Sequence, residues 1–228
     1  MLRALLGILR THDPLQAIGE RFGRMLKLTL EMTLSAGDIA FGGDAAPESR
    51  TRIYDLDVEV NKLERSIRKR IVAHLSTPGS RVDVPYCLLL MSLAKDVERL
   101  GDYAKNLSEV ADVREAPFPD DEVVGELREI RRGVEAAFQA AAHIFEASDR
   151  EQAMQNIQHG RDMVHRCDAL ITRIGRGGYD GETTTALVLA TRFYKRIGGH
   201  VMNILSSVVM PLHKIDYYDE DELAGSPE

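Results

Sequence analysis

Residues 97–107 read VERLGDYAKNL, and they align without a gap with residues 194–204, which read YKRIGGHVMNI. Five positions of this eleven-residue window match in kind: Arg99 with Arg196, Leu100 with Ile197, Gly101 with Gly198, Asn106 with Asn203, and Leu107 with Ile204. Helical periodicity alone gives fewer matches at one fixed register. The two segments therefore indicate that the chain contains an internal duplication.

Each copy of this segment lies in the last of three predicted helices. Apolar residues recur at steps of three and four, and turn residues separate the helices. The predicted helices are residues 14–39, 48–75, 83–110, 122–146, a fifth between a Ser148-x-x-Glu151 capping box and Gly175, and residues 182–212. No alternating segment bounded by hairpin turns indicates a strand. We predict an all-α protein of two tandem three-helix bundles with six long helices.

The chain divides at a Pro-rich break, residues 116–121. We expect a short N-terminal segment, two bundles and an acidic C-terminal tail that is disordered; these regions are residues 1–13, 14–115, 121–215 and 216–228. The apolar stretch within residues 1–9 is too short for a secretory signal. We expect them to pack on the protein's own bundle rather than on a membrane.

Charge and cysteine content exclude several classes of protein. The net charge is −7, but the tail holds six acids and no base, so the remaining residues carry 29 − 30 = −1. A nearly neutral body does not provide a basic footprint for nucleic acid. The two cysteines, Cys87 and Cys167, lack C-x-x-C spacing, so we expect buried thiols in a reducing cytoplasm.

Four oxygen-bearing side chains form the candidate site. Glu98 and Asp102 lie four residues apart, at the edge of the predicted core-facing stripe, and the preceding helix offers Asp57 and Asn61 at the same spacing. Oxygen ligands without His or thiolate suit Mg²⁺, Mn²⁺, Ca²⁺ or iron. The alternative is that these are surface acids paired with neighbouring cations, namely Lys62, Arg65, Arg99 or Lys105.

The segment DVERLGDYAKNL at residues 96–107, with Asp57-x-x-x-Asn61 on the helix before it, resembles the PhoU family of phosphate-uptake regulators. The resemblance covers about residues 14–212. In that family an acidic E/D-x-x-x-D pair on the second and third helices of each repeat carries surface clusters of iron, zinc or similar ions. The resemblance therefore implies a metal-binding face at Glu98, Asp102, Asp57 and Asn61.

The second repeat departs from the family pattern. Lys195 and Gly199 stand at the positions of Glu98 and Asp102, and Val164 stands at the position of Asp57. A protonated lysine has no lone pair for a metal. We therefore expect at most one metal ion (iron, zinc, Mn or Mg), in the first repeat, unless Asp162, His165, Asp168 and His200 together form a second site.

The resemblance also implies a function. The implied function is that of a non-enzymatic, cytoplasmic adaptor that binds the ATPase subunit of a phosphate ABC transporter, a histidine kinase, or both. The adaptor would reach the membrane through these partners. A homodimer is one form that the protein could take. A second hypothesis is an accessory subunit of another transporter, such as a sodium-phosphate or metal carrier. A third, a carboxylate-metal enzyme, is weaker because no Glu-x-x-His pair accompanies the acids.

Overall fold

The structure is a computed structural model that describes residues 14–42, 47–114 and 116–215. The first bundle consists of α2 (Pro14–Ala40), α3 (Pro47–Leu75) and α4 (Val84–Ser108), with a short α5 (Val110–Val113) after it. The second consists of α6 (Glu122–Ala147), α7 (Arg150–Arg176) and α8 (Gly181–Val209). The described residues contain no strand, and the predicted all-α fold of two three-helix bundles is confirmed. The predicted segments 1–13 and 216–228 lie outside the described residues.

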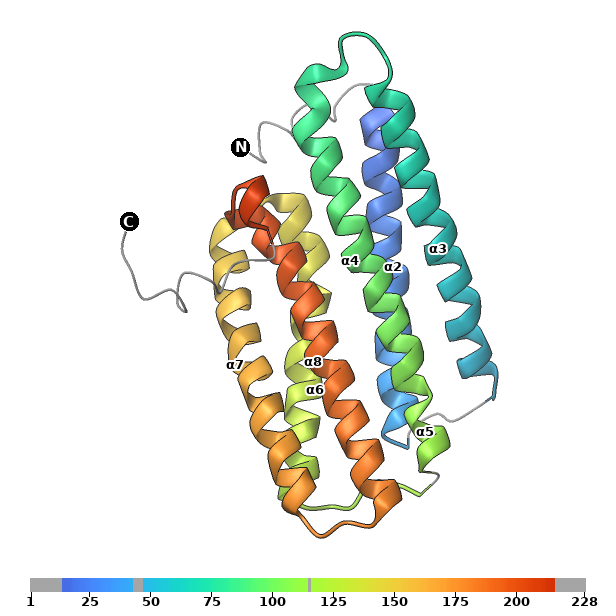
Figure 1. The fold of residues 1–228 in the computed structure, drawn as a ribbon, viewed down its shortest axis with the longest axis vertical. Helices are drawn as coiled ribbons and strands as arrows, with labels where there is room; N and C mark the ends of the chain where they lie inside the picture. Colours follow the sequence, from blue (N-terminus) through green and yellow to red (C-terminus); the bar gives the residue numbers. More distant parts are fainter. Residues whose placement is uncertain (1–13, 43–46, 115, 216–228) are drawn as a thin grey trace.

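The two bundles lie side by side, with their helices along the long axis of the molecule (Figure 1). The third helices, α4 and α8, pack on each other and form the most extensive contact between the bundles. The duplicated segments 97–107 and 194–204 belong to these two helices. The element that reveals the duplication in the sequence is therefore also the element that joins the two copies.

At two helix ends the difference from the sequence-based prediction has an identifiable physical cause. The prediction of a capping box at Ser148 is wrong. Ser148 adopts a left-handed conformation (φ 52°) that ends α6. The Asp149 side chain caps α7 instead, because it accepts the Gln152 N–H. The last helix ends at Val209 rather than at residue 212. Met210 precedes Pro211 and is extended (φ −94°, ψ 153°), because the proline ring disfavours a helical residue before it.

The core follows the predicted apolar stripes. Leu90, Val97, Gly101 and Ala104 are buried on the inward face of α4. Cys167 is also buried, and burial raises the pKa of its thiol to about 12, so at neutral pH it stays protonated and unreactive. Cys87 is buried too. The expectation of buried packing cysteines is confirmed.

No helix in the described ranges has both the length and the apolar character needed to cross a lipid bilayer.

Candidate functional site: the acidic face between α3 and α4

The helix pair α3–α4 brings the predicted site residues onto one face. Asp57 and Asn61 come from α3, and Glu98 and Asp102 come from α4. The Asn61 amide donates to Asp57 Oδ2 at 3.3 Å. The side chain of Asp57 is 13% exposed, and that of Asp102 is 29% exposed. The four residues therefore lie at the rim of the core, as their spacing predicted.

Lys105 connects the two acidic pairs. It lies one turn after Asp102 on α4, and its Nζ is 3.3 Å from Asp57 Oδ2 and 3.6 Å from Asp102 Oδ1. Burial lowers the pKa of Lys105, but the two carboxylates raise it by more, so the pKa lies above its ordinary value. A lysine ammonium that stays charged thus lies between the acid of α3 and the acid of α4.

Glu98 has its own cations on α4. Its carboxylate is 2.6 Å from Lys95 Nζ and 3.9 Å from Arg99 Nε, and Arg99 Nη1 donates to Asp102 Oδ2 at 3.2 Å. Charges of opposite sign therefore alternate along this face, from Lys95 through Glu98, Arg99, Asp102 and Lys105 to Asp57. Each carboxylate is within ion-pair distance of at least one cation of the same chain.

These contacts do not fit a shared metal ion. Hard divalent ions take six or more oxygen ligands, or keep waters beside two carboxylates, and they need open lone pairs. Asp57 and Asp102 instead face an ammonium group, which supplies donors only. Within the part of the chain that the structure describes, no three His, Cys, Asp or Glu side chains gather as metal ligands would. The arrangement found is the ion-paired alternative that the sequence left open; metal binding itself stays a prediction.

Gly101 lies beside the Asp57 carboxylate. A Cβ atom at Gly101 would lie 3.8 Å from Asp57 Oδ1 and 3.5 Å from Met32 Cε and Thr29 Cγ2. These are ordinary van der Waals distances. The packing around Gly101 therefore leaves room for a methyl group.

Replacing Gly101 with Ala is expected to leave the fold intact and to stabilise it by up to about 1 kcal/mol, because glycine inside a helix costs about that much relative to alanine. Chemical denaturation with urea measures the change. Gly198→Ala is the matched control in the second bundle, where the new Cβ would lie 3.4 Å from Val134 Cγ2. A loss of more than about 1 kcal/mol in Gly101→Ala would show that the Asp57 side of the helix cannot accept the methyl group.

Within the described residues, the side chains expected as a possible second metal site in the second bundle do not gather as metal ligands would. Lys195 Nζ contacts both carboxylate oxygens of Asp168 at 2.6 Å. His200 turns to the other bundle, where its Nδ1 lies 2.8 Å from Asp96 Oδ1. Asp168 and His200 therefore have separate partners, and His165 is exposed on α7.

Spacing did not identify the polar contacts between the bundles. Asp96, on α4, is 8% exposed and is bound by His200 Nδ1 and by Asn203 Nδ2, both at 2.8 Å. The His200 ring also stacks on Tyr103, with centroids 5.6 Å apart. Asp96 is the first residue of the quoted motif DVERLGDYAKNL and precedes the duplicated segment 97–107, and Asn203 matches Asn106 in the repeat. The only available signal was thus that an acid stands next to the duplicated segment.

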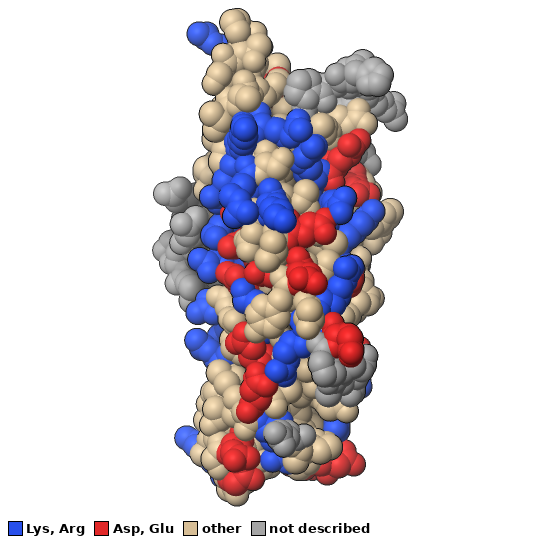
Figure 2. All heavy atoms as spheres, turned by 90° about the vertical axis from the view of Figure 1, so that its right-hand side faces the viewer, with Lys and Arg blue, Asp and Glu red and all other residues tan. Residues whose placement is uncertain are grey.

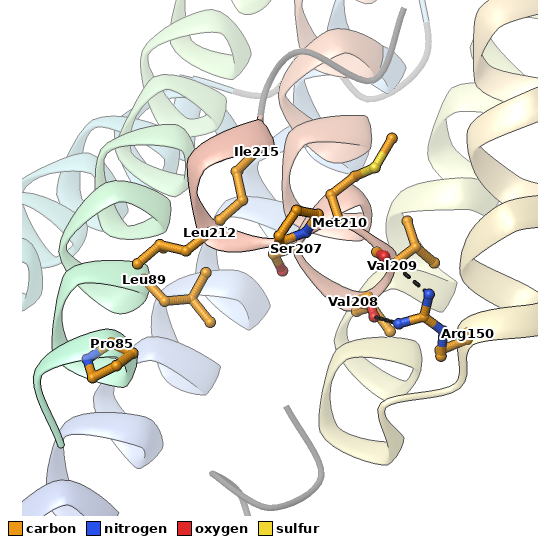
Figure 3. A pocket seen from close by; sticks show the side chains of 10 residues that line it. Pro85, Leu89, Arg150, Ser207, Val208, Val209, Met210, Leu212 and Ile215 are labelled. Atoms are coloured by element: carbon orange, nitrogen blue, oxygen red, sulfur yellow. Dashed lines mark hydrogen bonds between the residues drawn. The ribbon is translucent and has the colours of Figure 1, made fainter. Parts of the chain in front are cut away.

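A small apolar pocket opens where α4, α7 and the end of α8 meet (Figure 3). Its volume is about 240 Å³, and Pro85, Leu89, Val208, Met210, Leu212 and Ile215 provide most of its wall. Arg150 donates to the carbonyl oxygens of Val208 and Val209 at 3.3 and 3.0 Å, and Ser207 Oγ donates to the Ile204 carbonyl. Arg150 thus binds the carbonyl groups at the end of α8, whereas the Ser207 hydroxyl is bonded within that helix.

A basic surface covers the second half of α3. Residues 65–82 contain no acid, and their basic side chains are exposed: Arg65, Arg68, Lys69, Arg70 and Arg81. Figure 2 shows Lys and Arg gathered on the upper half of this face. Arg68 pairs with Glu64, whereas Arg65, Lys69 and Arg70 form no ion pair within the described residues. Val72, on the same helix, is 59% exposed. We call the surface formed by Arg65, Arg68, Lys69, Arg70 and Val72 the basic face of α3.

Comparison with known proteins agrees with the fold and with the motif. Residues 22–111 match the PhoU domain family. An uncharacterized protein from Deinococcus radiodurans is 26% identical over 207 residues, which are 85% of this chain and 72% of that protein.

Two crystal structures share the fold. PhoU from Pseudomonas aeruginosa superposes with a TM-score of 0.78 at 20% identity, over 88% of this chain and 97% of that one. The phosphate transport system regulatory protein PhoU from Streptococcus pneumoniae gives 0.74 at 18% identity, over 86% and 93%. The resemblance read from the sequence is confirmed: residues 22–111 match the PhoU domain family, and the fold is shared with the two solved PhoU proteins.

Proposed function

We propose that this protein regulates phosphate uptake and phosphate signalling as a cytoplasmic adaptor. It binds the ATPase subunit of a phosphate ABC transporter, a sensor histidine kinase, or both, and it reaches the membrane through them. The observation that carries the proposal is the PhoU domain at residues 22–111 inside a PhoU fold. The solved relative from Streptococcus pneumoniae is named as a regulator of a phosphate transport system.

The structure offers one surface suited to such an adaptor. In the basic face of α3, Arg65, Lys69 and Arg70 form no ion pair within the described residues, and an exposed valine lies beside them; the face is on the outer side of the first bundle (Figure 2). Charge complementarity steers protein association and selects partners. An acidic surface on the ATPase subunit is the partner chemistry that this face fits. The proposal contains no catalytic step.

Reversing the charge of the basic face tests this function. In a pull-down with the tagged full chain, the triple variant Arg65→Glu, Lys69→Glu and Arg70→Glu is expected to retain at least about tenfold less ATPase subunit, since three attractive charges become repulsive. In cells, the same variant is expected to release a phosphate-repressed reporter in phosphate-rich medium.

The matched control is Arg132→Glu, Arg192→Glu and Arg196→Glu, which reverses three exposed charges on the second bundle. It is expected to retain the partner and to keep the reporter repressed. If both triple variants retain the same amount of ATPase subunit, the basic face of α3 is not the surface that binds it. A reporter that responds normally to phosphate after deletion of the whole gene would overturn the regulatory function itself.

The alternative, an accessory subunit of another transporter, has one observation in its favour. The family match covers only the first bundle, and the second has Lys195 and Gly199 in place of the acidic pair. Recovery of a sodium-phosphate or metal carrier in the pull-down, without ABC transporter subunits, would favour this function.

A further inference from the structure

Both bundles place a lysine of their third helix against an aspartate of their second helix. We propose that Lys105 in the first bundle and Lys195 in the second supply the cation for these carboxylates, so that neither helix pair depends on a bound metal ion. The sequence motif predicted a metal at the first of these positions. The contacts in the structure place an ammonium group there instead.

The first step of the argument is charge. The acidic face carries three carboxylates, Asp57, Glu98 and Asp102, and the structure sets three cations of the same chain among them, Lys95, Arg99 and Lys105. The face is therefore neutral as it stands. A divalent ion gains its affinity from uncompensated negative charge, and here that charge is already compensated.

The second step is position. Lys105 is the member of this set that reaches across to the other helix, at 3.3 Å from Asp57 on α3. Its side chain is 24% exposed and that of Asp57 is 13% exposed, so the pair is partly shielded from water and is stronger than a surface pair. A metal ion bound by Asp57 and Asp102 would have to displace this ammonium. It could not share the site, because an ammonium offers no lone pair and repels a cation.

The third step is recurrence. In the second bundle, Lys195 of α8 contacts both oxygens of Asp168 of α7 at 2.6 Å. The two lysines do not occupy equivalent positions, since Lys195 aligns with Glu98 and Lys105 has Met202 as its counterpart. The same type of contact between the second and third helices therefore arises from two non-equivalent positions. A single lysine that was present before the duplication would not explain both contacts.

Metal binding and thermal unfolding of the purified full chain test the proposal. Wild type is expected to show the same melting temperature, within about 1 °C, without addition, with excess EDTA, and with Mn²⁺ or Zn²⁺. Calorimetric titration with either ion is expected to give no saturable binding that depends on Asp57. A lower melting temperature in EDTA, or Mn²⁺ or Zn²⁺ binding that Asp57→Asn and Asp102→Asn abolish, would overturn the proposal.

A variant without Lys105 provides the second part of the test. Lys105→Met keeps the length of the side chain and removes its charge, so Asp57 loses its cation. We expect the melting temperature to fall by about 3–6 °C and Mn²⁺ to restore part of the loss. Saturable Mn²⁺ binding that depends on Asp57 is expected to appear in this variant, where wild type shows none. Lys105→Arg is expected to keep the wild-type response.

The matched control is Lys62→Met on α3, because Lys62 is exposed and forms no ion pair within the described residues. It is expected to change neither the melting temperature nor the response to Mn²⁺. A Lys105→Met protein that melts like wild type and gains no response to Mn²⁺ would also overturn the proposal. If that variant does not fold, the wild-type measurements with EDTA and metal decide the question alone.

Discussion

Replacing Arg131 with Met lowers the free energy of unfolding by about 3 kcal/mol, which is the expected result of leaving a largely buried carboxylate without its cation. Arg131 lies on α6 and its side chain is 17% exposed. Its Nε donates to Glu135 at 2.8 Å, and its Nη1 donates to the carbonyl oxygen of Gly37 on α2 at 2.9 Å. The same guanidinium also binds Asp38 and stacks over the ring of Phe41. One side chain thus joins the first helices of the two bundles.

The pH dependence of this loss identifies Glu135 as its source. Burial raises the pKa of Glu135 above its ordinary value of 4.5, against the opposing effects of Arg131 and Tyr194. Without Arg131 the pKa rises further, so the folded variant binds this proton more tightly than the unfolded chain does. The loss is therefore complete above the raised pKa and shrinks as the pH falls through it.

Urea denaturation at neutral pH and at steps toward pH 5 measures both effects. Arg132→Met is the control, because Arg132 is the exposed neighbour on the same helix; it is expected to change stability by less than about 0.5 kcal/mol. If the two variants are equally stable, or if the Arg131→Met loss does not change with pH, this contact does not hold the bundles together.

Replacing Gly37 with Ala is expected to destabilise the protein by about 2–3 kcal/mol, which is the usual cost of forcing an extra carbon into a packed site. A Cβ atom at Gly37 would lie 2.4 Å from the Tyr194 hydroxyl, 2.7 Å from Glu135 Oε1 and 3.0 Å from Arg131 Cζ. Tyr194 is fully buried and donates to Glu135 at 2.9 Å, so its ring cannot turn away freely. Either α2 must shift or this hydrogen bond must break.

The control for this substitution is Gly199→Ala. Gly199 also lies inside a long helix, α8, but a Cβ atom there meets nothing within 4 Å. Both variants gain the same helix propensity, so the difference between their free energies of unfolding reports the crowding at Gly37. Equal stabilities would show that the bundles can part slightly at this point without cost.

The helices were predictable because local rules determine them. Apolar spacing of three and four residues, Gly and Pro turns and the duplicated motif predicted six helices in two bundles, and the structure has them. The errors lie at helix ends, where neighbouring residues compete. Asp149 rather than Ser148 caps α7, because Ser148 already closes α6 in a left-handed conformation.

The acidic face was predictable in position but not in partner. Spacing correctly placed Asp57, Glu98 and Asp102 at the rim of the core, since helical angles are fixed by the sequence. Spacing could not decide whether a metal ion or a lysine ammonium group neutralises these carboxylates. That depends on how far Lys105 reaches between α3 and α4, which is a distance between helices.

The sequence by itself determined the class of the fold, its duplication and its resemblance to PhoU, because these depend on periodicity and on one motif. Only the tertiary structure decided which charges meet. Arg131 binds Gly37 and Asp38, more than ninety residues earlier in the chain, and Asp96 binds His200 and Asn203, more than a hundred residues later. Such pairs have no spacing rule, because they arise where the two bundles pack on each other.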